Sequence, residues 1–353
     1  MDIKQENQDR KISKLNYEGL RVNISSHDAI KTISEIFNKL GCSPLNSYQI
    51  ANHLAEASLS GIESHGVMRT LQYANQIQNG LIEAENSPEI ASEEDQFLTI
   101  DGCSGHGIPA MILAFDQAMQ KAKIKGVAIT SIINVGHTGR HGSFADYAAE
   151  KGFLSIVIGG GNREVWRQVA PYGGSKAKLP TNPYCIGIPG GKKGSFVMDF
   201  ATSMIAGGWI YAAKNAGALL PEGCVIDKNG KPTINPQDYF DGGAILPAAQ
   251  QKGYAMALAA ELIAMALLGP VKTEANWLLI MIDINRFPAP NDFKKRAEEI
   301  LKDIRSCPPS EGFEKVEIPG EREREINKLA KGVIAIPEKT WKDICKLYKD
   351  LHS

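Results

Sequence analysis

The sequence lacks several features that mark secreted, metal-stabilised or membrane proteins. Its six cysteines are scattered and form no C-x-x-C pair, so they predict reduced thiols rather than disulfides or a zinc knuckle. The amino-terminal stretch is polar and mixed in charge, unlike a secretory signal. The most apolar segment, residues 254–269, carries Glu261 and is too short to span a bilayer, so we expect a buried helix there. These absences predict a cytoplasmic protein with no membrane partner.

An excess of charge of one sign is also absent. The 39 lysines and arginines nearly balance the 40 acidic residues, and no long run of either sign occurs. This balance gives no reason to expect a nucleic acid or an anionic membrane as partner. The 353 residues are 43% hydrophobic, which is enough for a large core in one or two domains.

Hydrophobic periodicity predicts an α/β protein whose first hundred residues are mostly helical. Apolar residues recur at helical spacing after residue 25, and later strands alternate with helices of 10 to 15 residues. We predict helices within 25–43, 46–61, 65–80, 110–126, 142–152, 293–307 and 337–351, and strands at 97–102, 127–135, 154–161, 195–203 and 276–287. We divide the chain into a polar arm (1–24), a helical substrate lobe (25–95), a cofactor-binding α/β domain (96–270) and a C-terminal segment (271–353).

The stretch "GIESHGVMR", residues 61–69, presents a histidine and an arginine together. His65 and Arg69 stand among small residues, whereas a core histidine more often has larger apolar neighbours. The stretch is typical of a loop that leads into a helix. It would display a titratable imidazole beside a fixed cation.

A second candidate is "GHTGRHGSF", residues 136–144, between a predicted strand and a predicted helix. Loops in such positions often carry functional groups, which favours a catalytic or substrate-facing His137. A structural loop histidine is the alternative. The H-x-x-x-H spacing of His137 and His141 also permits a metal-dependent hydrolase, although Gly139 and Gly142 interrupt any helix there.

The segment "GHGIPA", residues 105–110, has the form G-x-G-x-x-A and follows a predicted strand. A Rossmann fold uses such glycines to bring backbone amides to a pyrophosphate. No acidic residue ends a second strand at the usual distance, so we interpret this segment as an ordinary turn.

Several polar segments are ambiguous when taken alone. Small hydroxyl and amide residues at strand ends are as consistent with turns and caps as with ligand contacts, and the "IPGERERE" segment reads as a solvated charge run. Asp199 would need a partner if its strand buries it. Lys252, at the start of an apolar helix, would suit a phosphate or serve as an exposed cap.

The ordered set of segments is more informative than any one of them. "SHGVMR", "GHTGRHG", "APYGG", "PTNPYCIGIP", "DFATS", "LPEGCVIDKNGKPT", "ILPAAQQKGYAMAL" and "IPGERE" resemble the type-2 malate/L-lactate dehydrogenase family. That family includes ureidoglycolate, sulfolactate and diketogulonate enzymes and piperideine-2-carboxylate reductases. The resemblance extends from about residue 27 to the C-terminus.

The resemblance implies an oxidoreductase that uses NAD or NADP and forms a homodimer. It implies a non-Rossmann, mixed-sheet cofactor domain and a helical N-terminal lobe that the C-terminal segment joins. The substrates would be small 2-oxo or 2-hydroxy acids, or cyclic imino acids such as piperideine-2-carboxylate, with no metal. The residues expected at the cofactor are Gly161, Asn162, Thr181, Asn182, Met198, Asp199, Phe200, Ala201, Thr202, Ser203, Met204, Lys252, Gly253, Gly320, Glu321 and Arg322.

A 2-oxo acid needs a cation for its carboxylate and a proton source for its carbonyl oxygen. Arg69 can bind a carboxylate through two parallel hydrogen bonds. His65 or His137 can exchange the proton, and we favour His65, with His137 polarising the same oxygen. Ser64 and Tyr73 would line the pocket.

The chain departs from the family pattern at three places. It has Gly208-Trp209 where many relatives have Gly-Lys, which weakens any assignment of NADP phosphate recognition. It has Ala248–Gln251 where others carry glycines. A longer segment adds Arg163, Trp166 and Arg167, and we hypothesise that the two arginines favour a bulkier or dianionic substrate.

Overall fold

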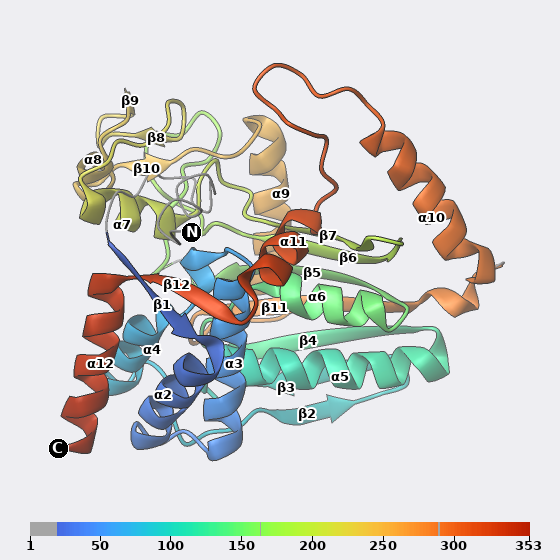
Figure 1. Ribbon diagram of the computed structural model, residues 1–353, viewed down its shortest axis with the longest axis horizontal. Helices are drawn as coiled ribbons and strands as arrows, with labels where there is room; N and C mark the ends of the chain where they lie inside the picture. Colours follow the sequence, from blue (N-terminus) through green and yellow to red (C-terminus); the bar gives the residue numbers. More distant parts are fainter. Residues whose placement is uncertain (1–19, 163, 289) are drawn as a thin grey trace, which may run out of the picture.

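The computed structural model describes residues 20–162, 164–288 and 290–353 (Figure 1). Most of the predicted polar arm and Arg163 lie outside these residues. None of the helices in the described part of the chain is long and apolar enough to cross a membrane. The six cysteines are free.

A mixed seven-stranded sheet forms the centre of the protein. Only β3 and β4 are parallel among the neighbouring strands described, and every other pair is antiparallel. The mixed sheet that we expected is therefore confirmed. In spatial order its strands are β2 (Glu89–Glu93), β3 (Phe97–Asp101), β4 (Val127–Val135), β11 (Ala275–Asp283), β5 (Phe153–Gly161), β6 (Tyr184–Gly191) and β7 (Gly194–Phe200).

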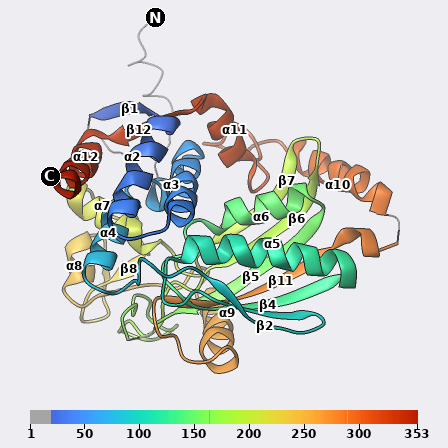
Figure 2. The ribbon, with the colours of Figure 1, turned by 90° about the horizontal axis from the view of Figure 1, so that it is seen from below.

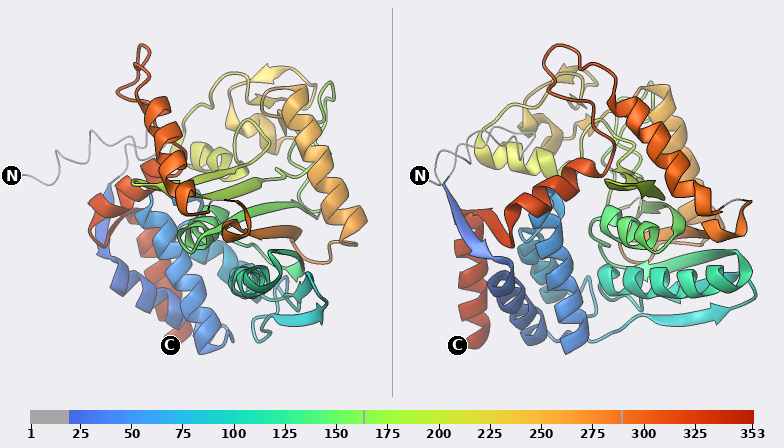
Figure 3. Two further views of the ribbon diagram at one scale, coloured as in Figure 1. Left: turned by 90° about the vertical axis from the view of Figure 1, so that its right-hand side faces the viewer. Right: turned by 45° about the vertical axis from the view of Figure 1, so that its right-hand side comes forward.

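The two faces of this sheet are covered differently. Along β4, β5, β6 and β11 every second residue is buried, and α5 (Gly107–Lys125) and α6 (His141–Glu150) pack on that face. Most of the alternate residues of these strands are only half-buried, although Gly160 and Asn276 are buried. Helix α9 (Gln251–Glu261) and the π-helical turn η2 (Leu262–Leu267) lie against the end of that second face, as the left view of Figure 3 shows.

The N-terminal helices form a layer beside the sheet, and the C-terminal end of the chain completes it (Figure 2). Strand β1 (Arg21–Ser25) pairs antiparallel with β12 (Val333–Pro337), and α12 (Glu338–His352) packs on α2. The helices of this layer are α2 (Ser26–Lys39), α3 (Pro44–Leu59) and α4 (Arg69–Gln78).

The starts of α2 and α3 follow from their capping residues. The hydroxyl of Ser25 accepts a hydrogen bond from the amide of Asp28, and Ser43 does the same for Asn46. Pro44 occupies the first turn of α3, where its missing N–H has no partner to lose. The apolar face of α2 is fully buried.

The remaining elements surround the second half of the sheet. A small sheet joins β10 (Ala244–Ile245), β8 (Val225–Ile226) and β9 (Pro232–Thr233). The other helices are α7 (Gly207–Ala216), α8 (Pro236–Phe240), α10 (Pro290–Arg305) and α11 (Glu321–Ala330), with single 3-10 turns η1 (Glu63–His65) and η3 (Ile284–Arg286).

Two of the predicted helices need correction. The helix expected over 65–80 begins only at Arg69, because a 3-10 turn and Gly66 precede it. The helix at 254–269 is not buried all round: Leu258 is 40% exposed, Leu262 58% and Leu267 69%. An apolar composition therefore did not mean a core position here.

Candidate active site

Several strand ends meet at one edge of the large sheet. Because β11 lies antiparallel between β4 and β5, its first residue is opposite the last residues of both strands. In the same way, β6 begins where β5 and β7 end. The residues brought to this edge are His137 after β4, Gly161 and Asn162 at the end of β5, Glu274 before β11, Thr181 and Asn182 before β6, and Ala201–Ser203 after β7.

His137 is held from two sides through one ring nitrogen. Its Nδ1 lies 2.6 Å from the hydroxyl of Tyr73 and accepts a hydrogen bond from the amide of Gly139 at 3.1 Å. An amide N–H can only donate, so Nδ1 is unprotonated and the neutral ring carries its proton on Nε2. Burial, then Arg69 and His65, hold the pKa of His137 well below its usual value.

His65 lies beside His137, with the two ring centroids 5.5 Å apart. Its Nδ1 is 2.9 Å from the hydroxyl of Ser64. Burial, followed by the positive charge of Arg69, holds the pKa of His65 well below its usual value too. At neutral pH both imidazoles are therefore uncharged.

Arg69 is the first residue of α4, and it faces back toward the turn that carries His65. Its Nε donates to the carbonyl of Ser64 at 2.6 Å, and one terminal nitrogen donates to Gln72. None of the ion pairs found in the described parts of the chain includes Arg69. The guanidinium therefore donates its hydrogen bonds to neutral acceptors and makes no ion pair with a carboxylate in the described residues.

Gly208, at the start of α7, brings that helix to the same group. A Cβ atom at this position would lie 3.4 Å from Nη2 of Arg69 and 3.6 Å from Cβ of Ser64. Gly208 agrees with the family pattern, and the residue that departs from it, Trp209, directly follows Gly208 in the sequence. A methyl group at position 208 would be in ordinary van der Waals contact with the guanidinium.

Glu274 is a member of this cluster that the sequence analysis missed. Its carboxylate accepts a hydrogen bond from Nε2 of Gln76 at 3.2 Å and another from the backbone N–H of His137. Burial raises the pKa of Glu274 to about 7, although Arg69 and the two hydrogen bonds act in the opposite direction. The sequence shows an acidic residue directly before an apolar strand, but it does not show which groups surround that carboxylate.

Two buried aromatic rings, those of Tyr73 and His106, pack against the cluster. Tyr73 is fully buried, and its ring meets that of His106 edge-on with centroids 4.4 Å apart. Burial lowers the pKa of His106 to about 3, so this ring is neutral as well. Gly107 then lies so close to the His137 loop that a Cβ would be 2.2 Å from the carbonyl oxygen of Gly136. Residues 107–110 form the first turn of α5, so "GHGIPA" is a helix start and not the ordinary turn that we expected, and close packing accounts for Gly107.

The other histidine of the H-x-x-x-H pair has different neighbours. Nε2 of His141 lies 2.7 Å from the hydroxyl of Thr138, and its ring meets the edge of Trp277. Within the described residues, no group of three or more His, Cys, Asp and Glu side chains is arranged to hold a metal ion.

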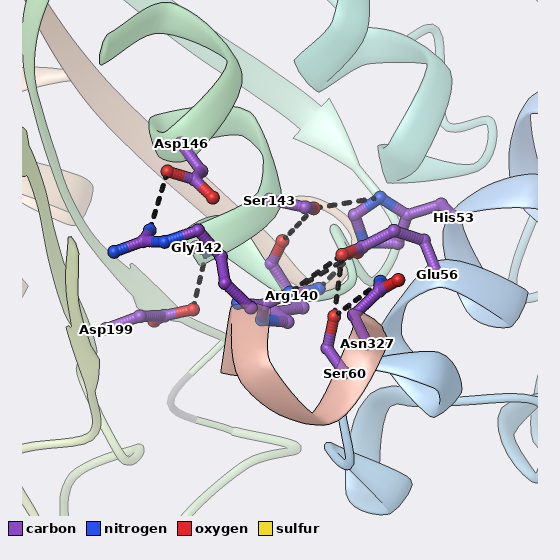
Figure 4. A network of polar contacts seen from close by, with 10 residues as sticks. His53, Glu56, Ser60, Arg140, Gly142, Ser143, Asp146, Asp199 and Asn327 are labelled. Atoms are coloured by element: carbon purple, nitrogen blue, oxygen red, sulfur yellow. Dashed lines mark hydrogen bonds and ion pairs between the residues drawn. The ribbon is translucent and has the colours of Figure 1, made fainter. Parts of the chain in front are cut away.

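A separate polar network joins α3, α6 and α11 (Figure 4). Buried Arg140 pairs with Glu56 at 3.1 Å, and its amide donates to Nε2 of His53 at 2.9 Å. Ser60 donates to Glu56 and accepts from Asn327. This network links the helical layer to the loop that carries His137.

Part of the expected cofactor set lies around the start of α9. The hydroxyl of Thr202 donates to the carbonyl of Thr181 at 3.0 Å, and the carbonyl of Thr202 accepts from the amide of Ala248. A Cβ at Gly253 would lie 2.1 Å from the carbonyl oxygen of Ala248. Lys252 is exposed at this helix end, which no side chain caps.

Two residues directly before α9 have strained backbone conformations. Ala249 and Gln250 adopt left-handed backbone conformations, with φ of +49° and +58°. The resemblance places glycines near these positions in relatives, and glycine takes such angles without steric cost. In this chain, L-residues carry that conformation.

Other members of the expected cofactor set are spread over neighbouring elements. Asp199 is exposed, and its Oδ2 accepts from the amide of Gly142 at the start of α6, at 2.7 Å (Figure 4). Asn182 is fully buried and donates to Glu261 at 2.7 Å, so it faces the interior. Gly320 is the N-cap residue of α11 and lies beside β7, where the amide of Val197 donates to the carbonyl of Pro319 at 3.0 Å.

The remaining residues expected at the cofactor differ in solvent exposure. Met198 and Ala201 are half-buried and Ser203 is buried, whereas Phe200, Met204 and Arg322 are exposed. Glu321 pairs with Arg305 at 2.6 Å. Arg167 lines a pocket of about 680 Å³ with Lys176 and Lys228, and that lining includes none of Ser64, His65, Arg69 and His137.

Comparison with known proteins identifies the family. The model of the malate/L-lactate dehydrogenase family matches residues 24–345, which confirms the resemblance seen in the sequence motifs. The L-sulfolactate dehydrogenase of Methanocaldococcus jannaschii is 35% identical over 311 residues, covering 85% of this chain and 88% of that protein.

Solved structures agree in fold. Malate dehydrogenase from Pyrococcus horikoshii superposes with a TM-score of 0.84 at 25% identity, covering 96% of this chain and 98% of that one. The Δ1-piperideine-2-carboxylate reductase of Pseudomonas syringae pv. tomato gives a TM-score of 0.83 at 27% identity, covering 92% and 99%.

Proposed function

The chain belongs to the malate/L-lactate dehydrogenase family, and we propose that it transfers a hydride between NAD(P) and a small 2-oxo or 2-hydroxy acid. Family membership makes it an oxidoreductase that acts on a CH–OH or C=N group. The observation that carries the proposal is the cluster of His65, Arg69 and His137 at one edge of the sheet.

Arg69 would bind the substrate carboxylate. Its hydrogen bonds to Ser64 and Gln72 fix the direction of the guanidinium, and the remaining N–H groups stay able to donate. Two parallel N–H···O bonds would hold the carboxylate and orient the reacting carbon. Ser64 and Tyr73 complete the pocket beside it.

The two histidines would serve the substrate oxygen in different ways. His137 is held with its proton on Nε2, so it would donate a hydrogen bond and polarise the oxygen. His65 is neutral, which is the form that can accept the proton of a 2-hydroxy acid during oxidation. In the reduction direction His65 would first take up a proton and then deliver it.

The residues near the start of α9 and the end of β7 fit a nicotinamide dinucleotide. An exposed lysine at a helix N-terminus without a side-chain cap suits a phosphate, and Lys252 has that position. Asp199 keeps Oδ1 for the hydroxyls of a sugar, because only Oδ2 bonds Gly142. When bound, the cofactor would supply or accept the hydride. The expected contacts at Thr181, Thr202, Ser203 and Gly253 lie beside Lys252, and both NAD and NADP stay open.

A cyclic imino acid is the alternative substrate. Arg69 would bind its carboxylate in the same way, and the proton would go to nitrogen instead of oxygen. Relatives named Δ1-pyrroline-2-carboxylate/Δ1-piperideine-2-carboxylate reductases favour keeping this possibility.

We also propose that the protein is a homodimer. Half-buried apolar side chains of β4, β5 and β11 occupy the face of the sheet opposite α5 and α6. Leu258, Leu262 and Leu267 are exposed on α9 and η2, which lie on the same side. A second copy of the chain would bury both sets.

The test is a turnover assay that follows the nicotinamide absorbance with purified protein. NADH and NADPH are each combined with pyruvate, oxaloacetate, sulfopyruvate, diketogulonate and piperideine-2-carboxylate. We expect turnover with at least one 2-oxo acid, and its loss in Arg69→Ala and His65→Ala. Turnover with the imino acid alone would establish the alternative. Absence of any cofactor binding would contradict the proposal.

A further inference from the structure

Glu274 is the acidic member of the candidate active site, and its main chain is fixed on both sides. Its amide donates to the carbonyl of Val135 at 3.2 Å, and its carbonyl accepts from the amide of Asn162 at 2.8 Å. These bonds join it to the ends of β4 and β5. The backbone of Glu274 is therefore fixed in position, and its side chain lies between α4 and the loop of His137.

Charged and titratable groups from several neighbouring elements surround this carboxylate. Helix α4 contributes Arg69, Tyr73 and Gln76, and the β4–α6 loop contributes His137 with His65 behind it. Both hydrogen-bond donors to the carboxylate, Gln76 and the His137 amide, are neutral. Arg69 is the cation that attracts it, and both imidazoles are uncharged.

Binding of an anionic substrate shifts the protonation equilibrium of Glu274 toward the neutral acid. A carboxylate bound at Arg69 neutralises the charge that favours ionised Glu274, and it adds a negative charge nearby. Both effects favour the protonated acid. We propose that Glu274 takes up a proton when a substrate carboxylate binds at Arg69, so that substrate affinity falls as the pH rises. This inference rests on the proposed function, because it takes Arg69 as the carboxylate-binding group.

The sign of the effect follows from linkage. Glu274 is ionised in the empty site above about pH 7, so binding there requires proton uptake. The dissociation constant then increases by up to about tenfold per pH unit above neutrality. Below neutrality the acid is already protonated, and this dependence disappears. Glu274 thus acts on substrate binding through the charge of Arg69, and it sets which pH favours binding.

The experiment uses oxamate, an unreactive analogue of a 2-oxo acid, with the full-length protein and saturating cofactor. Calorimetry in two buffers of different protonation enthalpy gives the number of protons taken up. We expect nearly one proton per site about one pH unit above neutrality, and nearly none one unit below it. Glu274→Gln should abolish the uptake and bind oxamate about tenfold more tightly at the higher pH.

Three variants separate this explanation from others. Glu298→Gln is the matched control, since Glu298 is another carboxylate beside an arginine, on α10, and its uptake should equal that of wild type. His65→Gln and His137→Gln test whether an imidazole, rather than Glu274, takes up the proton when oxamate binds. Uptake that persists in Glu274→Gln but disappears in a histidine variant would overturn the proposal.

Two further outcomes keep the inference distinct from the proposed function. A wild-type dissociation constant that stays level across neutral pH would overturn the role of Glu274 even if Glu274→Gln failed to fold. Oxamate binding that is unchanged in Arg69→Ala would instead contradict the proposed function, because the carboxylate would bind elsewhere.

Discussion

The hydroxyl of Tyr73 lies 2.6 Å from Nδ1 of His137, on the side where the amide of Gly139 already donates to the same nitrogen. The Tyr73 hydroxyl must therefore donate as well, since an unprotonated Nδ1 can only accept. Helix α4 and the loop after β4 thereby determine together which nitrogen of His137 bears the proton. The pair connects the layer that carries Arg69 to the sheet that carries His137.

Tyr73→Phe removes one donor to His137 and leaves the buried ring in place. We expect kcat to fall about three- to tenfold with little change in KM, since one neutral hydrogen bond contributes about 1 kcal/mol. Steady-state kinetics with the best substrate measure this. Tyr348→Phe, which removes a hydroxyl bonded to Glu35 in α2, is the control and should leave kcat unchanged. An unaltered kcat in Tyr73→Phe would mean that this bond does not orient the catalytic ring.

Arg69→Lys keeps the positive charge and replaces the planar guanidinium with an ammonium group. We expect KM for the 2-oxo acid to rise at least about tenfold, because an ammonium group cannot form two parallel bonds to a carboxylate. Arg69→Ala should regain part of its activity when guanidinium ions are added, whereas Arg69→Lys should not. Equal KM values for Arg69→Lys and wild type would place the carboxylate away from this residue.

Acid should destabilise the protein in the range where its buried histidines remain neutral but the unfolded chain binds protons. Burial lowers the pKa of His53 and His106 to about 3, below the unfolded value of 6.5. The unfolded state therefore binds more protons as the pH falls from 6.5 toward 3, and each group removes about 1.4 kcal/mol of stability per pH unit. Urea unfolding at several pH values measures the slope. His106→Gln should reduce it, and an unchanged slope would contradict this origin.

Gln250→Gly should stabilise the protein, because Gln250 has a left-handed backbone conformation that glycine adopts freely. The expected gain in the free energy of unfolding is about 1 kcal/mol, offset in part by the greater freedom of glycine in the unfolded chain. Thermal unfolding with and without cofactor measures it. Gln251→Gly, at the first helical residue, is the matched control and should be neutral or destabilising. A loss of stability in Gln250→Gly would show that its side chain makes a contribution larger than the strain.

Leu262→Arg should dissociate the proposed homodimer. Leu262 is 58% exposed beside the half-buried face of the sheet, and a charge there would have to be desolvated at an interface. Light scattering after size-exclusion chromatography should give the mass of one chain for the variant and two for wild type. Leu219→Arg, exposed outside this face, serves as the control. A wild-type monomer would contradict the proposal.

The sequence predicted local elements better than their arrangement. Residues 127–135 were expected as a strand and form β4 with the same bounds, because its apolar pattern is local information. The position of β11 between β4 and β5 is not local, since about 110 residues of chain separate β5 from β11. Glu274 was missed for this reason: its neighbours depend on which strands pair.

The expected cluster of Ser64, His65, Arg69 and Tyr73 came from one short stretch of sequence. Helical spacing relates only Arg69 and Tyr73, which are one turn apart on α4, because Ser64 and His65 lie in the preceding 3-10 turn. Its proximity to His137 came from the family resemblance. Asn182 stays a prediction for the cofactor site, and the structure shows its hydrogen bond to Glu261 in the interior, which the sequence did not indicate. A small polar residue at a strand end has no sequence signal that tells an interior hydrogen bond from a ligand contact.

The antiparallel pairing of β1 with β12 brings residues 21–25 against residues 333–337. During synthesis the first of these strands emerges more than three hundred residues before its partner. Until β12 is made, the layer of α2 and α3 therefore lacks the partner of β1. The central sheet also waits for a late strand, because β11 lies between β4 and β5. The layer that carries Arg69 is completed only after residues 333–337 have been synthesised, which is later than every strand of the central sheet.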